Sequence, residues 1–381
     1  MNFLCLALPR WNANYVSSTV EILKEIGKKH QVIYIDYQKT WLDILKSPFS
    51  DESLRSLGIK KRVHSENDVL IWHLPPLIPV NWIKNRKKFI KIARFNGFLI
   101  GHSINRLLNK FGIKEYHMIN AFTPVYGIVT QPFISPDKTI YYCYDEISAA
   151  KWLKTHGAWA EKIFIKKADT VIVSSIPLFN SKKAYNSNIH LVKNGVDFQL
   201  FQRFIDIKRF EDTSEFIIGY VGSIDDRLDY DLLIMLIESL PGVRFRFMGR
   251  CLDERAKKIW KYENVEYLGT LKPVELAKEV NKIHLGLIPF VKNEFTTNIY
   301  PLKINEYLAC GCAVVSTHFS DLSDFEKDIY ISEKYSEFIE LCKIALTENN
   351  MDKALKRVEV AKGNSWSSRA ELFLSSIANS N

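Results

Sequence analysis

The sequence of 381 residues has little cysteine and no long apolar run. Its most apolar stretch, residues 68–83, is interrupted by His73, three prolines and Asn81, so no membrane-spanning helix is expected. The six cysteines have no metal-type spacing, which indicates reduced thiols rather than a disulfide framework. Because the first nine residues lack a basic leader and no Asn-x-Ser/Thr sequon occurs, a cytoplasmic location is predicted.

Two common phosphate-binding motifs are also missing. Neither Gly-x-Gly-x-x-Gly after a strand nor the P-loop motif occurs, so a dinucleotide-dependent dehydrogenase and a P-loop NTPase are disfavoured. The chain does carry an excess of positive charge, with 52 lysines and arginines against 43 acidic residues, a net charge of +9. This excess favours an anionic partner: nucleic acid, a phosphorylated ligand or an acidic membrane surface.

Short apolar runs alternate with amphipathic segments along the chain. Residues 3–8 predict a buried strand and residues 17–29 a helix, and the alternation restarts after residue 200. This alternation is typical of βαβ units, so the predicted fold class is α/β with two Rossmann-like, doubly wound parallel-sheet domains. The charged segment 198–214 lacks apolar periodicity and is predicted to link them.

Residues 296–317 carry the clearest site signal in the chain. Thr296 to Asn298 predict a cap, Pro301 the first helical turn and Gly311 the end of the helix. Such a helix follows a predicted strand, so its free N–H groups and dipole would form an anion site at the carboxyl edge of the sheet.

Lys303 and Glu306 share one face of this predicted helix, because they are three residues apart. A carboxylate one turn beyond a phosphate site is well placed to accept two hydrogen bonds from a ribose diol. The alternative is a helix whose polar side chains are only solvated.

Six motifs along the chain resemble those of the retaining glycosyltransferases of the two-domain GT-B fold. This family 4-like, or group 1, family is typified by bacterial capsule, lipopolysaccharide and teichuronic-acid transferases. The motifs are, in order, Pro9-Arg10-Trp11-Asn12, Tyr142-Cys143-Tyr144-Asp145-Glu146, residues 168–175, Lys193-Asn194-Gly195-Val196-Asp197, Gly219-Tyr220-Val221-Gly222-Ser223 and residues 301–315.

The resemblance runs nearly end to end and implies two domains that face a central cleft. Residues 1–200 would bind the acceptor and residues 201–363 the nucleotide sugar. Residues 364–381 would form a helix that crosses back to the N-terminal domain.

The resemblance also implies where the donor binds. The predicted nucleotide-sugar-binding residues are Gly222, Ser223, Arg227, Arg250, Asn298, Ile299, Tyr300, Leu302, Lys303 and Glu306. Glu306 matches the second glutamate of the family signature and would contact the ribose, whereas the first glutamate is replaced by Asn298. An amide still donates and accepts hydrogen bonds, but it carries no charge.

The usual diphosphate-binding cations of the family are replaced here by Ser223 and Leu228. Arg227, Arg250 and Lys303 are therefore the candidate cations for the diphosphate, together with the helix N-terminus. No metal ion and no cofactor are predicted, because no Asp-x-Asp pair flanked by apolar strand residues occurs and cations of the protein would neutralise the diphosphate. Cys310 and Cys312, one residue apart in a predicted helix-to-strand turn, fit the core better than a metal site.

In the N-terminal domain, Asp145 and Glu146 follow a predicted strand and are the candidate catalytic residues. Either carboxylate could orient an acceptor hydroxyl or assist its deprotonation. The alternative is that Asp145 only caps the helix predicted from Ser148. Candidate acceptor-binding residues are Arg10, Trp11, Asn12 and Tyr144.

A basic segment at residues 82–91 contains five cations among Trp82, Phe89 and Ile90. This pattern fits an anionic membrane surface, and a solvated helix face is the alternative. Nucleic acid is not a predicted partner, because no nucleic-acid-binding motif accompanies the charges.

The sequence therefore predicts a retaining glycosyltransferase of bacterial cell-surface polysaccharide synthesis, peripheral on the inner face of the cytoplasmic membrane. Its partners would be a nucleotide-diphosphate sugar and a glycan or lipid-linked acceptor. The alternatives are a nucleotide-sugar epimerase or an inverting transferase on the same fold, or a non-catalytic nucleotide-binding protein.

Overall fold

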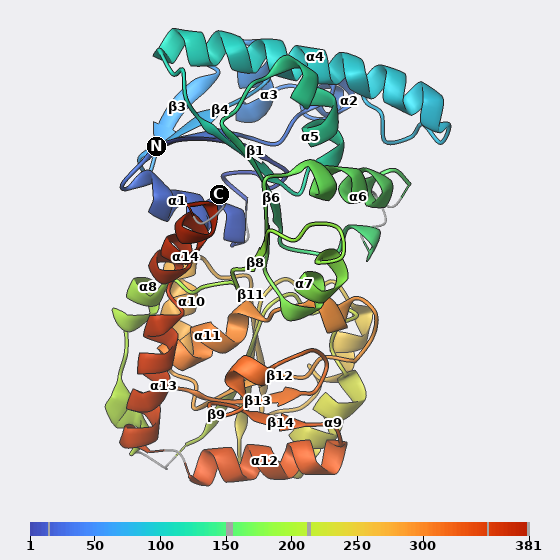
Figure 1. Ribbon diagram of the computed structural model, residues 1–381. Coiled ribbons are helices and arrows are strands. Elements are labelled where there is room, and N and C mark those ends of the chain that lie inside the picture. The colour runs from blue at the N-terminus through green and yellow to red at the C-terminus, as the bar shows by residue number, and fades with distance from the viewer. Residues whose placement is uncertain (14–15, 150–154, 212–214, 349, 379–381) are drawn as a thin grey trace. The chain divides into compact units, whose positions relative to one another are not determined.

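The computed structural model describes residues 1–13, 16–149, 155–211, 215–348 and 350–378. Contacts divide the chain into unit 1, which is Met1–Lys193 with Arg369–Asn381, and unit 2, which is Asn194–Ser368. Helix α14 (Trp366–Ala378) begins in unit 2 and continues into unit 1 (Figure 1). These divisions lie a few residues from the predicted ones at 200 and 363.

The described strands of unit 1 form an eight-stranded sheet in the order β3-β4-β2-β1-β5-β6-β7-β8. All neighbours are parallel except β3 and β4, which are antiparallel. The strands are β1 (Asn2–Ala7), β2 (Gln31–Ile35), β3 (Val63–Glu66), β4 (Val69–Trp72), β5 (His117–Ala121), β6 (Lys138–Cys143), β7 (Thr170–Val173) and β8 (Ile189–Leu191).

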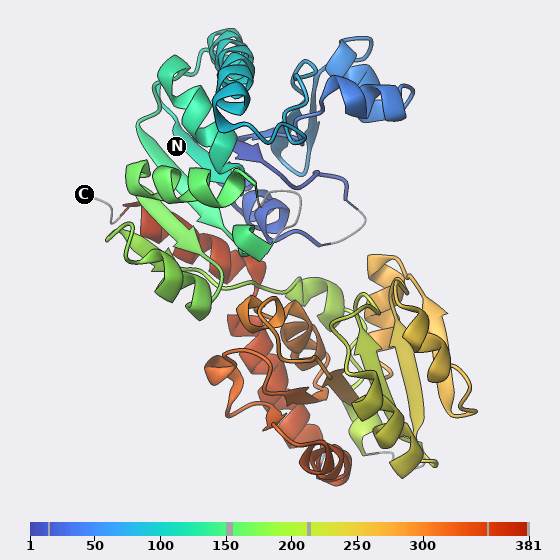
Figure 2. The same ribbon diagram turned by 90° about the vertical axis from the view of Figure 1, so that its right-hand side faces the viewer.

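Helices cover both faces of this sheet (Figures 1 and 2). On β6, the ring of Tyr141 packs on Phe164 of α6, whereas the ring of the next residue, Tyr142, packs on Phe373 of α14. Successive strand residues point to opposite faces, so α6 and α14 cover opposite faces of the sheet. The helices of unit 1 before α14 are α1 (Ser18–Gly27), α2 (Trp41–Lys46), α3 (Asp51–Leu57), α4 (Arg86–Phe111), α5 (Pro124–Thr130), α6 (Gly157–Lys167) and α7 (Ile176–Lys182).

The described strands of unit 2 form a six-stranded, fully parallel sheet in the order β11-β10-β9-β12-β13-β14. The strands are β9 (Ile217–Val221), β10 (Arg244–Met248), β11 (Val265–Gly269), β12 (Leu285–Ile288), β13 (Ala313–Thr317) and β14 (Tyr330–Ser332). The helices are α8 (Phe198–Gln202), α9 (Tyr230–Ser239), α10 (Pro273–Val280), α11 (Leu302–Ala309), α12 (Tyr335–Thr347) and α13 (Met351–Gly363). The central strands β9, β12 and most of β13 are buried, as expected for a parallel sheet between two helix layers.

Residues 198–214, predicted as a polar linker, are partly an element of unit 2. Residues 212–214 lie outside the described residues, but the rest contains α8 and a 3-10 turn, Ile207–Phe210. Phe198, Phe201 and Phe210 are all buried. The linker prediction was wrong here because three phenylalanines without helical periodicity still provide enough apolar surface to anchor the segment.

Candidate functional site

Each sheet has a point where the strand order reverses, and ligands of open α/β sheets bind outside the carboxyl ends of the strands at such a point. In unit 2 the reversal lies between β9 and β12, and in unit 1 between β1 and β5. The predicted donor-binding residues Gly222 and Lys303 follow β9 and β12 in the chain. The loop at Arg10 follows β1.

In unit 2, the turns after β9 and β10 approach each other closely at Gly222 and Gly249. Both glycines have positive φ, +148° and +143°, and a Cβ atom on Gly249 would lie 1.9 Å from the Gly222 carbonyl oxygen. Only glycine fits this arrangement, which leaves backbone rather than side chains at this edge of the sheet.

Helix α11 is fixed beside this edge by Tyr307, a residue that the sequence analysis missed. The Tyr307 hydroxyl accepts a hydrogen bond from the backbone N–H of Val221 at 2.8 Å and donates to the Gly219 carbonyl at 3.3 Å. Its ring packs so closely on β12 that a Cβ atom on Gly286 would lie 2.4 Å from it. Tyr307 thereby ties α11 to the residue that precedes Gly222, and Glu306 is the preceding residue of the same helix.

Lys303 and Glu306 form an ion pair one turn apart on α11. The Lys303 ammonium lies 3.0 Å from both carboxylate oxygens of Glu306. Glu306 is buried, with 6% of its surface exposed, and the Lys303 side chain is 25% exposed. The structure therefore places a cation and a carboxylate together, one turn into the helix, at the carboxyl edge of the sheet.

The other two candidate cations differ in their surroundings. Arg227 forms a two-pronged ion pair with Asp225 at 2.7 and 2.8 Å, and its guanidinium lies over the ring of Phe290. Arg250 is exposed just after Gly249, and the structure gives its side chain no described partner. Arg250 is therefore the most available of the three cations, because the charges of Arg227 and Lys303 are each balanced by a carboxylate.

Several residues that lead into α11 do not have the roles predicted for them. Thr296 does not cap the helix: its hydroxyl donates to the Val291 carbonyl at 2.6 Å, and α11 starts after Pro301 without a side-chain cap. The Asn298 side chain lies outside the described residues. Tyr300 is buried against Phe325. Ile299 and Leu302 are partly exposed, and the Ser223 carbonyl accepts a hydrogen bond from Tyr220.

In unit 1, Asp145 and Glu146 form the turn after β6. The Asp145 carboxylate accepts the backbone N–H of Glu146 at 2.8 Å. The Glu146 carboxylate accepts both the N–H and the hydroxyl of Ser148, at 3.1 and 2.9 Å. Capping at Ser148, the alternative role considered for Asp145, is thus performed by Glu146.

Glu146 also belongs to a buried charge cluster with Lys182 of α7. The Lys182 ammonium lies 3.0 Å from Glu146 and 2.7 Å from Glu161 of α6, which in turn accepts a hydrogen bond from Tyr141 at 2.9 Å. Although burial opposes its ionisation, the neighbouring ammonium lowers the pKa of Glu146. Glu146 is therefore a charged, fully engaged residue.

The loop after β1 divides into buried and exposed parts. Trp11 is buried against Tyr34, so it serves the core rather than an acceptor. Arg10 is exposed and lies over Tyr37 at 5.1 Å, and Asn12 is exposed. Tyr144 is half-buried, with its ring 4.7 Å from that of Phe122.

Asp36 and His73 lie at the same edge, directly after β2 and β4, and the sequence analysis missed them. Asp36 Oδ1 accepts the backbone N–H groups of Trp11 and Tyr37, at 3.0 and 2.8 Å, and Oδ2 lies 3.6 Å from His73 Nδ1. Burial raises the pKa of Asp36 to about 6, although the two N–H donors act in the opposite direction. Burial lowers the pKa of His73 to about 4. The sequence could have indicated both residues, because each is a polar residue directly after an apolar strand.

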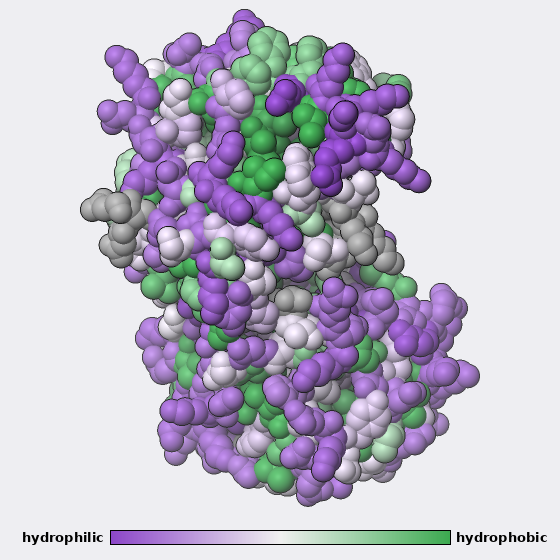
Figure 3. Space-filling view, turned by 45° about the vertical axis from the view of Figure 1, so that its right-hand side comes forward, coloured by the Kyte–Doolittle hydropathy of each residue, from purple (hydrophilic) through white to green (hydrophobic). Residues whose placement is uncertain are grey.

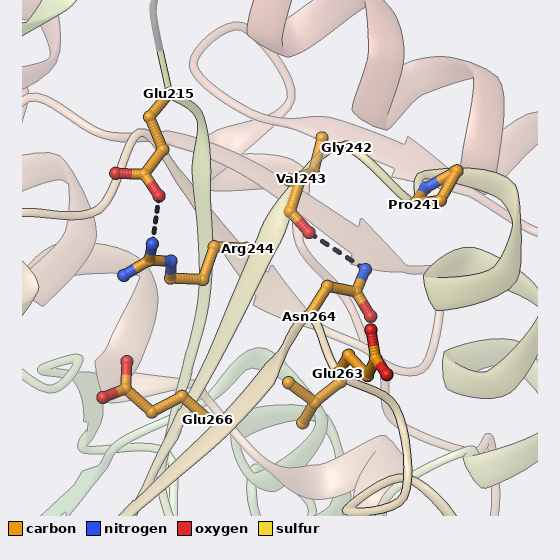
Figure 4. Close-up of a pocket in the computed structure, with 9 residues that line it drawn as sticks. Glu215, Pro241, Gly242, Val243, Arg244, Glu263, Asn264 and Glu266 are labelled. Carbon is orange, nitrogen blue, oxygen red and sulfur yellow. Dashed lines mark hydrogen bonds and ion pairs between the residues drawn. The ribbon is translucent and has the colours of Figure 1, made fainter.

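One hollow, of about 450 Å³, lies at the opposite, amino-terminal edge of the unit 2 sheet (Figure 4). It is lined by residues at the starts of β9, β10 and β11, where Arg244 pairs with Glu215 at 2.5 Å and Asn264 donates to the Val243 carbonyl. It is not part of the predicted donor site, which lies at the carboxyl edge. Within the described residues, no three His, Cys, Asp or Glu side chains are grouped to hold a metal ion.

Comparisons with known proteins agree with this geometry. Residues 215–343 match the family model of glycosyl transferases group 1. The chain is 24% identical over 311 residues to TuaH of Bacillus subtilis (strain 168), which is named as a glycosyltransferase of teichuronic acid biosynthesis. That alignment covers 74% of this chain and 78% of the relative.

Solved structures share the fold over almost the whole chain. Sucrose-phosphate synthase from Thermosynechococcus elongatus has a TM-score of 0.68 at 15% identity and covers 99% of both chains. A trehalose-6-phosphate structure from E. coli with bound UDP-2-fluoro glucose has a TM-score of 0.71 at 10% identity, with 100% and 99% of the chains covered.

The fold is that of the GT-B glycosyltransferases, as the sequence predicted, and the protein is a glycosyltransferase. More particularly, residues 215–343 of unit 2 match the glycosyl transferases group 1 family, which confirms the predicted resemblance over that part of the chain.

Proposed function

We propose that this protein is a retaining transferase that moves a sugar from a nucleoside-diphosphate sugar to a glycan or lipid-linked acceptor in bacterial cell-surface polysaccharide synthesis. The observation that carries the proposal is the Lys303–Glu306 pair, held on α11 beside the Gly222 turn. The name of the Bacillus relative and the nucleotide sugar bound in the E. coli structure support the substrate class.

On the donor side, the proposed ligand separates the Lys303–Glu306 pair. The carboxylate of Glu306 accepts hydrogen bonds from the ribose hydroxyls, and the ammonium of Lys303 turns to the diphosphate. Arg250 and the free N–H groups at the start of α11 add positive potential where the leaving nucleotide gains charge. In this proposal, cations of the protein stabilise departure of the nucleotide, and no metal ion is assigned.

On the acceptor side, we assign Asp145 rather than Glu146 to the reacting hydroxyl. Both oxygens of Glu146 are within reach of Lys182, and one also accepts from Ser148, which leaves little capacity for a substrate. A half-buried carboxylate at the end of β6 can accept the hydroxyl proton and so orient the acceptor. Arg10 and Asn12 are the exposed residues of the neighbouring loop that could contact the same glycan.

The membrane proposal concerns the cytoplasmic face of an anionic bilayer. Of the apolar residues in segment 82–91, Trp82 is 71% exposed, whereas Phe89 is buried against His156. The cations of the segment are exposed, and α4, which contains most of them, has no acidic residue. Among the described helices, none is long and apolar enough to cross a membrane.

The test begins with calorimetry against UDP and GDP, followed by hydrolysis of UDP- and GDP-sugars with EDTA present. We expect binding of one nucleotide and slow, chelator-resistant release of a sugar, with the α-anomer retained in NMR spectra of the transfer product. Tight nucleotide binding without turnover on any donor and acceptor would instead identify a binding protein. Complete loss of activity in EDTA, restored by a divalent cation, would contradict the assignment of leaving-group stabilisation to protein cations.

A further inference from the structure

Helix α2 and the turn that follows it expose an unusual amount of apolar surface. Trp41, Leu42, Leu45 and Phe49 are 50%, 46%, 74% and 88% exposed. Large apolar side chains exposed together within nine residues are a candidate site of interaction, because monomeric soluble proteins rarely expose large apolar patches. Figure 3 shows hydrophobic residues gathered among strongly hydrophilic ones at the upper end of the molecule, over unit 1.

Only Ile44 of α2 is buried, and the residues around the helix add polar rather than apolar groups to the interior. Lys39 is 4% exposed, and its ammonium donates to the hydroxyls of Ser50 and Ser53 at 3.1 and 3.0 Å. Ser53 and Ser56 of α3 are fully or almost fully buried. The polar groups bond to one another inside, so the apolar side chains outside have no place in the core of unit 1.

The carboxylates of α2 and α3 are paired with nearby groups of the protein. Their repulsion of an anionic surface is therefore reduced. Asp43 accepts from the backbone and hydroxyl of Thr40 in a capping box. Asp51 pairs with Arg55 and Lys60 at 2.5 and 2.6 Å, which lowers its pKa to about 2.

This apolar patch lies beside the cationic helix α4. The backbone of Trp41 donates to Leu77, and the next residue, Ile78, exchanges two hydrogen bonds with the Asn96 side chain in the middle of α4. Figures 1 and 2 both place α2, α3 and α4 at the same end of unit 1. Phe95 and Phe98, which flank Asn96, are also exposed, at 50% and 46%.

The charge of α4 indicates what covers the patch. Its exposed cations include Lys87, Lys88, Lys91, Arg94 and Arg106, and none of them forms an ion pair with a carboxylate among the described residues. A row of unpaired cations beside exposed tryptophan, leucine and phenylalanine is the composition of a surface that lies in the interface of an anionic bilayer.

We propose that α2 and the turn at Phe49 insert below the headgroups of an anionic phospholipid bilayer while the cations of α4 contact the headgroups. The inference rests on the membrane association proposed above and adds an apolar, salt-resistant component to it. Electrostatic contacts of exposed charges weaken with salt, whereas burial of apolar side chains does not. The two components are therefore separable by experiment.

The experiment is co-sedimentation of the full chain with vesicles of phosphatidylcholine and phosphatidylglycerol at 0.1 and 0.5 M NaCl, two concentrations that bracket strong and weak screening. The apolar variant is Leu42→Ser/Leu45→Ser/Phe49→Ser. Its matched control, Leu252→Ser/Leu355→Ser/Leu372→Ser, changes leucines of 55%, 47% and 46% exposure elsewhere. The charge variant is Lys84→Gln/Arg86→Gln/Lys87→Gln/Lys88→Gln. Thermal unfolding verifies that each variant folds.

We expect the parent and the control to retain binding at 0.5 M NaCl and the apolar variant to bind at least about tenfold more weakly there. Fluorescence quenching by brominated lipids should fall in Trp41→Phe, because Trp41 enters the bilayer. Equal binding of parent and apolar variant at both salt concentrations overturns the inference. A vesicle-free dimer that only the apolar variant loses also overturns it, since the patch would then be a protein interface.

These outcomes are distinguishable from failure of the proposals on which the inference rests. If the charge variant loses binding at low salt and the apolar variant does not, membrane association through α4 stands and insertion of α2 is wrong. If the parent binds no vesicle, both membrane proposals fail, while sugar transfer to a water-soluble acceptor still tests the glycosyltransferase proposal.

Discussion

The ammonium group of Lys182 lies within 3.2 Å of both carboxylate oxygens of Glu146, although 36 residues separate them in the chain. Lys182 ends α7, and Glu146 lies in the turn after β6, so the pair joins the end of a helix to the turn after a strand. With Glu161 as a second anionic partner, Lys182 is the only cation in the described contacts of this cluster. The turn that carries Asp145 thus depends on one lysine.

Lys182→Met should destabilise the protein by about 3–5 kcal/mol, because it leaves Glu161 and Glu146 buried without a counter-charge. Chemical denaturation measures the effect. Lys183→Met, at the exposed neighbouring position, is the control and should change stability by less than about 0.5 kcal/mol. Adding Glu161→Gln to Lys182→Met should recover part of the loss. A Lys182→Met protein as stable as the parent would contradict the cluster's proposed role.

Asp145→Asn should lower kcat by about 10²–10⁴, the usual contribution of a general base, with little change in the donor KM. Glu146→Gln should act mainly on stability, since it weakens the contact with Lys182. Steady-state kinetics with donor and acceptor varied in turn separate these effects. Parent-like turnover of Asp145→Asn would remove Asp145 from the reaction.

Glu306→Ala should weaken nucleotide binding by roughly 1.5–3 kcal/mol, the value of a hydrogen bond to a charged group. The sharper comparison uses UDP and its 2′,3′-dideoxy analogue. The parent should prefer UDP, and the variant should bind both alike, because the ribose contact is gone. Calorimetry measures the affinities, and Glu326→Ala, at an exposed position, is the control. An unchanged preference in Glu306→Ala would place the ribose elsewhere.

Asp36→Asn should reveal a pH dependence of stability that Asp36 and His73 conceal in the parent. Asp36 keeps its proton in the folded state up to a pKa of about 6, so its contribution to stability falls as pH rises from about 4 to 6. His73, with its pKa lowered to about 4, gives the opposite slope between pH 4 and 6.5, because only the unfolded state takes up the proton there.

Each pKa shift changes the free energy of unfolding by about 3 kcal/mol, at about 1.36 kcal/mol for each unit of pKa shift. The two changes have opposite signs and therefore nearly cancel. Asp36→Asn keeps an acceptor for the N–H groups of Trp11 and Tyr37 and removes one slope. Its free energy of unfolding should therefore rise by about 3 kcal/mol from pH 4 to 6.5, relative to that of the exposed control Asp226→Asn. If the free energies of unfolding of the two variants depend on pH in the same way, Asp36 and His73 do not have opposite effects on stability.

The sequence predicted the parallel core well because buried parallel strands are continuous apolar runs. The first strand, predicted at residues 3–8, is β1 at Asn2–Ala7. It did not predict the antiparallel hairpin β3–β4. The hairpin turns at Asn67 and Asp68, which both have positive φ, and its first strand, Val63–Glu66, is polar and at the sheet edge.

The candidate site was predictable where one short segment contains it. The pairing of Lys303 with Glu306 follows from helical spacing. The contacts of Tyr307 with Val221 and of Lys182 with Glu146 join residues 86 and 36 positions apart, and spacing carries no information at that range. Trp11 was a candidate acceptor residue through the family motif at residues 9–12, but its backbone donates to Asp36 and its indole is buried.

Helix α14 also determines when unit 1 can complete its core during synthesis. Phe373 and Ile377 are almost fully buried, and Phe373 packs on Tyr142 in the middle of the unit 1 sheet. The ribosome adds these residues only after all of unit 2 has been made. Most of unit 1 is synthesised first, but its core is complete only when the last helix has been added. Unit 2 can therefore reach its native packing before unit 1 does.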